Sequence, residues 1–445
     1  MELFDWQRPL AEAAVKALEK DRIFILGACT GSGKTPITCE VIKRLGCPAL
    51  IVAPKVSLTQ WKKTIEAMNV CTVVGIINPE QISKPGGCSW CTHEGKADDR
   101  KSGDLCQWHI PKDCLVVFDE IHRGASGPNS VTTQAVATLR AYQGSRLMAL
   151  SATVADSPLK LRALGYWLGF HNYSIRDFHR WCKNYGCSSR VIGWGRRSRS
   201  IFTFTTSPTR ARLLMGEIRK TMGDRFLSVK PEDIPGFPDE ELDVLRLDLA
   251  AKDRDALERA YEEMPDQYKD LTEDEMVQTL RLREQAEWCK AEAIAEMAVS
   301  FESDGLSVFI LVNFTDARKR IEDYLKDKGV AYASIYGGQK DAERQEGIDA
   351  FQRNDIHVLV AMAAAASCAL SAHDERHERP RVSLISPGYN ASDVKQGLGR
   401  IRRVNGTKAV QHFVLAAESV EERVAKTLER KLANIDSLND GDLLR

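Results

Sequence analysis

Short apolar runs recur along the first third of the chain, and each is followed by a more polar stretch. The runs occupy residues 23–26, 49–54, 70–77, 115–118 and 147–150. Continuous apolar runs of this kind are typical of strands buried on both faces, as in a parallel sheet. The stretches between them have helical spacing; Pro9 begins one in which Ala14 and Leu18 share a face. Strands that alternate with helices predict an α/β unit with a parallel sheet.

The same alternation returns near the C-terminal end. Apolar runs at 307–312, 332–336, 358–360 and 382–385 are separated by helical patterns over 315–325 and 341–351. Thr315 can cap the first of these helices, and Gly329 can end it. This half of the pattern predicts a second α/β unit with its own sheet.

Length and composition agree with two or three domains, because 445 residues, 43% of them apolar, are many for one core. The formal net charge is zero, so only local clusters of charge can argue for nucleic acid. The first residues do not form a signal peptide, and no apolar run is long enough to span a membrane. The twelve cysteines are dispersed. We therefore expect a protein that is not secreted, does not enter a membrane and has no disulfide framework.

The first apolar run leads into a phosphate-binding pattern. Residues 28–35 read Ala-Cys-Thr-Gly-Ser-Gly-Lys-Thr and fit the P-loop, a strand–loop–helix element. Glycines let backbone N–H groups face a polyphosphate, Lys34 can reach the terminal phosphates, and the Thr35 hydroxyl can hold Mg²⁺. The predicted nucleotide contacts are Thr30, Gly31, Ser32, Gly33, Lys34 and Thr35. The alternative, an incidental Gly/Ser loop, is disfavoured by the flanking strand and helix patterns.

Asp119 and Glu120 directly follow the fourth apolar run. Open α/β sheets bind ligands at the carboxyl ends of their strands. Asp119 can hold Mg²⁺, and Glu120 can polarise the attacking water. A surface carboxylate pair that begins a helix is the alternative. Upstream, Gln7 can read adenine through its amide or can serve only as a helix-entry residue.

A motif near the C-terminus contains three arginines; residues 396–403 read Gln-Gly-Leu-Gly-Arg-Ile-Arg-Arg. Guanidinium groups are permanently charged and suit a phosphoryl group in its transition state. We predict that Gln396 and Gly399 belong to the nucleotide site and that Arg400 and Arg403 are catalytic. If both arginines come from a second lobe, hydrolysis depends on closure of the lobes. A basic helix face is the alternative for this stretch.

The motifs occur in an order that resembles superfamily 2 helicases and translocases. It runs from the P-loop through residues 119–122 (Asp-Glu-Ile-His) and 151–153 (Ser-Ala-Thr) to the arginine motif. Residues 51–55 followed by Gln60-Trp61, and Ser157-Pro158 after the Ser-Ala-Thr, are similar to the Swi–Snf branch. The stretch around 370–381 resembles compact phage and virus members.

This resemblance implies two RecA-like lobes, the cofactors ATP and Mg²⁺, and hydrolysis coupled to movement on, or remodelling of, double-stranded or branched DNA. It also implies a cytoplasmic protein, in the host cytoplasm if a phage encodes it. An RNA helicase and a non-enzymatic nucleic-acid-binding scaffold are the alternatives. The scaffold draws its support from residues 361–368, which are rich in alanine where motif V of the family usually has glycines.

The segment 87–114 has the spacing of a structural zinc site. Cys88-x-x-Cys91 and Cys106-x-x-His109 are separated by a polar loop that lacks apolar residues for a core. Four such ligands close a tetrahedral site, so we predict Zn²⁺, with His93 and Cys114 as spare ligands. Free cysteines in a loop are the alternative. Lys96, Arg100 and Lys101 can touch DNA or form a solvated surface.

A second segment, about 166–225, is strongly basic. From 176 to 225 it holds twelve Lys/Arg and three Asp/Glu, a local charge of +9 (12 − 3), while 232–275 holds seventeen acidic and five basic residues, or −12. Arginines bind phosphates and aromatics stack on bases, so we predict DNA contact; a solvated face balancing the acidic stretch is the alternative. The aromatic residues of the segment are Trp181, Tyr185, Trp194, Phe202 and Phe204.

These patterns predict four domains or regions. Residues 1–165 form RecA-like lobe 1, which carries the zinc-binding insertion 87–114. Residues 166–230 form the basic insertion, 231–300 form a linker and helical region, and 301–445 form RecA-like lobe 2.

Overall fold

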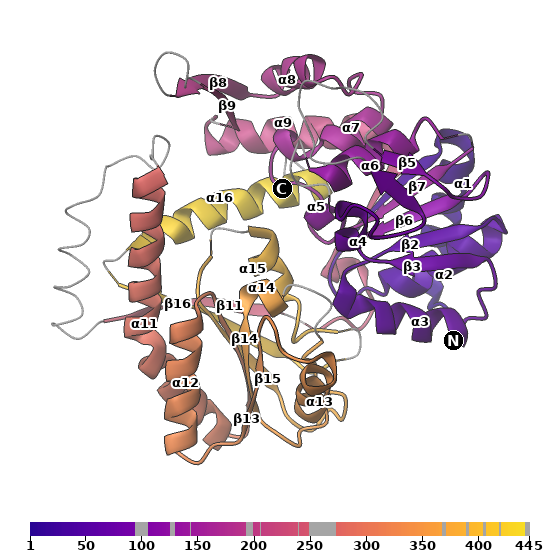
Figure 1. Ribbon diagram of the computed structural model, residues 1–445. Helices are drawn as coiled ribbons and strands as arrows, with labels where there is room; N and C mark the ends of the chain where they lie inside the picture. Colours follow the sequence, from indigo (N-terminus) through magenta and orange to yellow (C-terminus); the bar gives the residue numbers. More distant parts are fainter. Residues whose placement is uncertain are drawn as a thin grey trace. The chain divides into compact units, whose positions relative to one another are not determined.

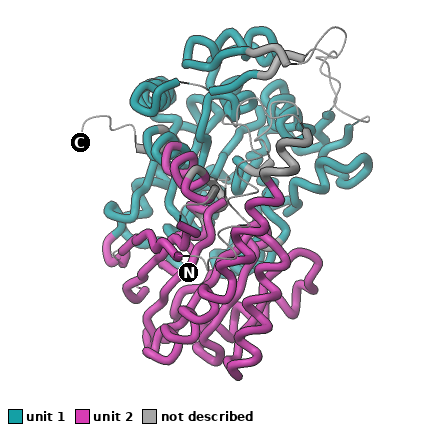
Figure 2. The backbone as a smooth tube through the Cα atoms, turned by 90° about the vertical axis from the view of Figure 1, so that its left-hand side faces the viewer, with its two compact units in different colours: residues 1–234, 431–445 teal, residues 235–430 magenta. Residues whose placement is uncertain are grey.

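The computed structural model describes residues 1–93, 106–124, 130–142, 144–192, 199–204, 206–238, 240–248, 273–366, 371–388, 391–403, 406–417 and 420–440. The chain divides into two compact units (Figure 2). Unit 1 comprises Met1–Ile234 and Lys431–Arg445, and unit 2 comprises Pro235–Arg430. Within these described ranges, no helix combines the length and apolarity needed to cross a membrane.

Unit 1 is built on a six-stranded parallel sheet in the order β10-β1-β7-β6-β2-β3 (Figure 1). Its strands are β1 (Ile23–Ala28), β2 (Ala49–Val52), β3 (Val73–Ile77), β6 (Leu115–Asp119), β7 (Arg146–Leu150) and β10 (Phe226–Val229). Every residue of β1 and β2 is buried, as expected for strands covered on both faces. Parallel pairing puts the carboxyl ends of β1, β7 and β6 at one edge, in adjacent positions.

The helices of unit 1 connect these strands. They are α1 (Arg8–Asp21), α2 (Lys34–Leu45), α3 (Leu58–Ala67), α4 (Pro79–Ser83), α5 (Ile121–Gly124), α6 (Val131–Leu139), α7 (Arg162–Trp167), α8 (Ile175–Asn184) and α9 (Pro208–Met222). Helix α1 buries Ala14 and Leu18, the face that its spacing predicts. Two antiparallel hairpins interrupt the alternation: β4 (Cys91–His93) with β5 (Cys106–Trp108), and β8 (Cys187–Ile192) with β9 (Arg199–Phe204).

Unit 2 is built on a second six-stranded parallel sheet, in the order β11-β16-β15-β12-β14-β13. Its strands are β11 (Glu240–Leu247), β12 (Ser307–Val312), β13 (Tyr332–Ile335), β14 (Val358–Met362), β15 (Arg381–Ile385) and β16 (Ala409–Ala416). The predicted pair of parallel-sheet α/β lobes with a RecA-like fold is thus confirmed.

The helices of unit 2 include a long one that precedes the first core strand. They are α11 (Glu273–Ser303), α12 (Thr315–Asp327), α13 (Asp341–Gln352), α14 (Ala363–Ala366) and α15 (Ala391–Leu398). Helix α11 contributes Ala291, Ile294, Ala295 and Ala298 to the core of this unit. Helix α16 (Val420–Asp440) begins in unit 2, and its last residues are counted in unit 1.

Candidate active site

The P-loop lies between β1 and α2, at the carboxyl edge of the unit 1 sheet. Gly31 and Gly33 have φ of 84° and 78°, which glycine adopts without strain. A Cβ on Gly33 would lie 2.4 Å from Gln7 Nε2, so the loop has no room for a larger residue there. The Lys34 ammonium donates to the carbonyls of Ala28 (3.0 Å) and Cys29 (3.2 Å), which holds the cation against the loop.

Gln7 is 3% exposed and is joined to the P-loop by its side chain. Its Nε2 donates to the Ser32 carbonyl (3.0 Å), and its Oε1 accepts from the Phe4 N–H (3.1 Å). The amide therefore connects the start of the chain to the phosphate-binding loop. This places Gln7 beside the P-loop, and its role in reading adenine stays a prediction.

Asp119 is the last residue of β6 and accepts a hydrogen bond from Trp61 Nε1 at 2.9 Å. Burial and then the neighbouring Glu120 carboxylate raise the pKa of Asp119 to about 6. A positive ion beside this carboxylate would counter both effects. Trp61 comes from α3, and its indole orients the carboxylate oxygen. The sequence analysis placed Trp61 in a family motif but did not predict its contact with Asp119.

Glu120 and the Ser-Ala-Thr segment are joined through His122. Glu120 has a φ of 50°, an uncommon backbone conformation for a residue other than glycine. His122 Nδ1 lies 3.4 Å from Glu120 Oε2 and 2.8 Å from Ser151 Oγ. Ser151 Oγ also accepts from the Thr153 N–H at 2.9 Å. The loops that follow β6 and β7 thus form one polar network.

The oxygen donors of this edge fit Mg²⁺. The hydroxyl of Thr35 and the carboxylate of Asp119 are hard ligands, and Mg²⁺ is commonly held by one or two protein oxygens together with phosphates and water. No group of three or more His, Cys, Asp or Glu side chains able to hold a metal occurs within the described ranges. A shared protein–phosphate site does not require one.

The arginine motif lies in unit 2. Gln396 is in α15, and Gly399 follows that helix. Arg400 is 2% exposed, and its carbonyl accepts from the Ala372 N–H at 2.9 Å. Arg403 Nη1 donates to the carbonyls of Gly399 (3.0 Å) and Arg402 (2.9 Å). Lys34, Asp119 and Glu120 belong to unit 1.

The predicted zinc cluster receives no support from the structure. Cys106 begins β5 and is buried, whereas His109 follows the end of that strand and is exposed. His109 Nε2 lies 2.8 Å from Thr92 Oγ1, and Cys106 Sγ donates to the Val131 carbonyl at 3.8 Å. Cys88 Sγ donates to the Cys91 carbonyl at 3.3 Å. Among the described residues, no group of side chains able to hold a metal is found here.

Three aromatic residues of the basic insertion, all within its described part, pack against other aromatic rings. Trp181 stacks on Phe170 with ring centroids 5.6 Å apart, Tyr185 tilts against Trp181 at 5.0 Å, and Phe202 stacks on His179 at 3.6 Å. These contacts account for the aromatics by packing rather than by base stacking. The exposed cations are Arg176, Arg180, Lys183, Arg210, Arg212 and Lys220.

Several predicted features fall wholly or partly outside the described residues. They include the cations at 96, 100 and 101, the Trp194 segment over 193–198, and the last two residues of the alanine-rich segment, 367 and 368. Residues 361–366 form the end of β14 and the short helix α14.

Two family models match the chain. Residues 1–156 match the res subunit of type III restriction enzymes, and residues 289–405 match the helicase conserved C-terminal domain. The first match contains the P-loop, Asp119-Glu120 and Ser-Ala-Thr, and the second contains the arginine motif.

Three curated proteins are similar to the chain. A putative ATP-dependent RNA helicase of Acanthamoeba polyphaga mimivirus is 26% identical over 99% of this chain and 84% of its own length. Chromatin remodeling factor mit1 of Schizosaccharomyces pombe is 26% identical over 32% of this chain and 10% of its own length. A SWI/SNF-related, matrix-associated, actin-dependent regulator of chromatin (subfamily A member 1) of Mus musculus is 28% identical over 34% of this chain and 14% of its own length.

Proposed function

The chain belongs to superfamily 2 of the helicases and translocases, which hydrolyse ATP, and from this premise we propose that it moves on or remodels double-stranded or branched DNA. One observation carries the proposed site. The loops after β1, β7 and β6, which hold the P-loop, Ser-Ala-Thr and Asp119-Glu120, end at one edge of one parallel sheet. That edge is where α/β sheets bind their ligands.

Each side chain at this edge has a role that its chemistry allows. Lys34 and the loop N–H groups bind the phosphates, and Thr35 and Asp119 hold the metal. Bound Mg²⁺ would neutralise charge on the transferred phosphoryl group. Glu120 accepts a hydrogen bond from the attacking water and orients it. Trp61 keeps Asp119 in place through its hydrogen bond. His122 lies between Glu120 and Ser151 and links these two residues.

Arg400 and Arg403 supply positive charge that stabilises the transition state and that unit 1 alone does not provide. A guanidinium that stabilises the equatorial phosphate oxygens commonly accelerates phosphoryl transfer by several orders of magnitude. Gln396 and Gly399 belong to the same motif and are assigned to nucleotide binding. The two arginines belong to unit 2 and Lys34 belongs to unit 1, so we propose that turnover requires both units.

The choice of nucleic acid is supported by two features. Parts of the chain are similar to two chromatin proteins, and the exposed cations of the basic insertion suit a phosphate backbone. RNA is the second candidate, because the similar viral protein is named an RNA helicase. The ATP-hydrolysing family leaves the non-enzymatic scaffold without support.

Glu120→Gln tests the assigned water-orienting group. The amide keeps the size of the side chain but cannot act as a base, so we expect ATP turnover to fall at least ~100-fold while ATP binding is kept. Turnover and the binding of a fluorescent ATP analogue measure the two effects. Glu66→Gln, an exposed change in α3, is the matched control. Undiminished turnover in Glu120→Gln would remove Glu120 from the mechanism.

ATPase stimulation decides between DNA and RNA. We expect duplex or forked DNA to stimulate turnover more than duplex or single-stranded RNA of equal length at the same salt concentration. Lys34→Ala gives the background rate. Greater stimulation by RNA would make the second candidate the correct one.

A further inference from the structure

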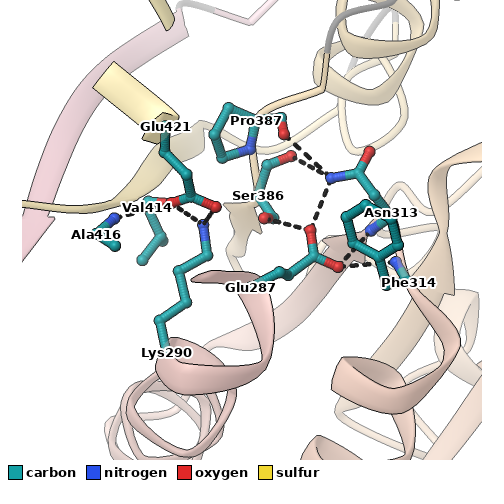
Figure 3. A network of polar contacts seen from close by, with 9 residues as sticks. All are labelled: Glu287, Lys290, Asn313, Phe314, Ser386, Pro387, Val414, Ala416 and Glu421. Atoms are coloured by element: carbon teal, nitrogen blue, oxygen red, sulfur yellow. Dashed lines mark hydrogen bonds and ion pairs between the residues drawn. The ribbon is translucent and has the colours of Figure 1, made fainter. Parts of the chain in front are cut away.

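A buried polar network lies at the carboxyl ends of three adjacent strands in unit 2 (Figure 3). The strands are β16, β15 and β12, and the network joins the residues that end or follow them to α11. Helix α11 contributes two charged side chains one turn apart, Glu287 and Lys290. Both point toward the strand ends rather than toward solvent.

Glu287 is 1% exposed and accepts four hydrogen bonds. The donors are the Asn313 N–H (2.7 Å), Asn313 Nδ2 (2.7 Å), the Phe314 N–H (2.8 Å) and Ser386 Oγ (2.6 Å). A buried carboxylate is tolerated only when its oxygens are satisfied, and these four donors satisfy them. The site is therefore built for a carboxylate at this position.

The place that Glu287 occupies corresponds to the phosphate-binding place of unit 1. In unit 1 the P-loop connects the end of β1 to α2; in unit 2 Asn313 and Phe314 connect the end of β12 to α12. The N–H groups at the start of a helix attract anions. Here the chain's own carboxylate takes that place, and it already accepts the N–H groups of Asn313 and Phe314.

The residues that contact Glu287 also hold the segment that leads to the arginines. Asn313 Nδ2 donates to the Pro387 carbonyl at 3.1 Å, and a Cβ on Gly388 would lie 2.8 Å from Asn313 Oδ1. Farther along, a Cβ on Gly397 would lie 2.6 Å from Leu311 Cδ2, so α15 packs directly on β12. Both ends of this segment are thus fixed to the end of one strand.

Lys290 fastens α11 to the next strands one turn later. Its ammonium, fully buried, donates to the Val414 carbonyl (2.7 Å) and to both oxygens of Glu421 (2.7 and 2.6 Å). Glu421 also accepts from the Ala416 N–H at 2.8 Å. This ion pair fixes the position of α11 relative to the carboxyl ends of the strands, and thereby the position of Glu287.

We infer that Glu287 is a positioning residue for ATP hydrolysis. Through Asn313 and Ser386 it sets the orientation of residues 386–388 and 391–403, which carry Arg400 and Arg403. The inference rests on the proposed function, since it concerns how those arginines are presented to the phosphates. It adds a residue outside the family motifs, on the helix that precedes the unit 2 sheet.

Glu287→Gln is the test. The amide NH₂ would face Asn313 Nδ2 and Ser386 Oγ, two groups that donate to the carboxylate. We expect kcat for ATP to fall about tenfold while KM changes less than about twofold, because unit 1 still binds the nucleotide. Glu296→Gln, an exposed change on the same helix, should behave like the wild type. A kcat for Glu287→Gln equal to that of the control would overturn the inference.

Ser386→Ala keeps the test decisive if Glu287→Gln does not fold. It removes one of the four hydrogen bonds, and we expect a smaller loss of kcat with the same unchanged KM. Full kcat in Ser386→Ala would then refute the inference. Arg400→Ala separates the two proposals: an unchanged rate there defeats the arginine mechanism itself. A slow Arg400→Ala with a fully active Glu287→Gln defeats only the positioning role.

Discussion

Single side chains at the carboxyl edge of the unit 1 sheet depend on partners that are distant in the chain. Trp61 Nε1 and Asp119 Oδ2 are 2.9 Å apart although the residues are 58 positions apart. The indole supplies a hydrogen bond that favours the charged carboxylate, against the burial that raises its pKa. Residues that orient a metal ligand commonly change metal affinity by ~10- to 100-fold when they are mutated, and Asp119 is the proposed Mg²⁺ ligand.

Trp61→Phe should raise the Mg²⁺ requirement of ATP hydrolysis. The ring still fills its place, but Asp119 loses its donor, so the Mg²⁺ concentration for half-maximal turnover should rise about 10-fold or more. Trp167→Phe is a matched control, since it also removes one indole hydrogen bond in unit 1, the 2.7 Å bond to the Val136 carbonyl. Equal Mg²⁺ requirements in the two variants would show that the indole does not orient Asp119.

At the scale of elements, α8 shows how the basic insertion is held together. The helix places Phe178 and Trp181 on one face, and His171, just before it, packs against both rings at centroid distances of 5.1 and 5.8 Å. His171 Nδ1 accepts from the Tyr173 N–H at 3.1 Å. Burial lowers the pKa of His171 to about 4; Asp177 opposes this effect, and Arg162 and Arg140 add to it.

His171 should therefore make unit 1 less stable in mild acid. Its pKa is lower in the folded state than the ordinary value of 6.5, so the unfolded chain binds the proton first. The stabilisation is complete above about pH 6.5 and is lost as the pH falls towards 4, up to about 3 kcal/mol.

Thermal unfolding midpoints across that pH range measure the effect. His171→Asn keeps an acceptor for the Tyr173 N–H but does not titrate, so its midpoint should fall less between neutral and acidic pH than that of the wild type. His109→Asn, at an exposed histidine, should follow the wild type. Parallel curves for all three proteins would contradict the prediction.

At the scale of the whole molecule, the end of the chain returns to the first unit. Residues 431–445 are counted in unit 1, and Asn434 Nδ2 donates to the Asp156 carbonyl at 3.3 Å. Asn434 and Ile435 are buried. Asp156 lies just beyond Ser-Ala-Thr, so the last helix supports the segment that follows the active edge.

Deletion of residues 431–445 should loosen that segment. Removing a buried hydrogen bond and a buried isoleucine exposes the backbone after β7, so amide hydrogen exchange over 151–161 should become faster. Deletion of 441–445 alone is the control, because it leaves Asn434 and Ile435 in place. Equal exchange in the two truncated proteins would show that α16 does not support this segment.

Features that depend on neighbouring residues could be predicted from the sequence. The apolar runs became strands of two parallel sheets, and the P-loop lies between β1 and α2, because a strand, a tight turn and a helix start depend on residues a few positions apart. Within the two large sheets, β10 and β16 were not predicted. β10 has four residues, and in β16 the polar Gln411 and His412 interrupt the apolar run.

Contacts between residues that are distant in the chain could not be predicted from the sequence pattern. The zinc prediction rested on spacing along the chain, but the structure buries Cys106 in β5 and leaves His109, just after that strand, exposed. The aromatics of the basic insertion have the composition of a nucleic-acid surface, yet Trp181 and its neighbours pack together. The sequence pattern shows which types of residue are present, but it does not show the direction in which each side chain points.

The amino-acid sequence alone was sufficient for the family, the two α/β lobes and the order of the ATP-site motifs, because each rests on contiguous residues. Folding was needed to pair Trp61 with Asp119, His122 with Ser151 and Glu287 with the ends of β12 and β15. The physical reason is burial. A polar group removed from water must find a partner, and which partner is near depends on how the strands are ordered in the sheet.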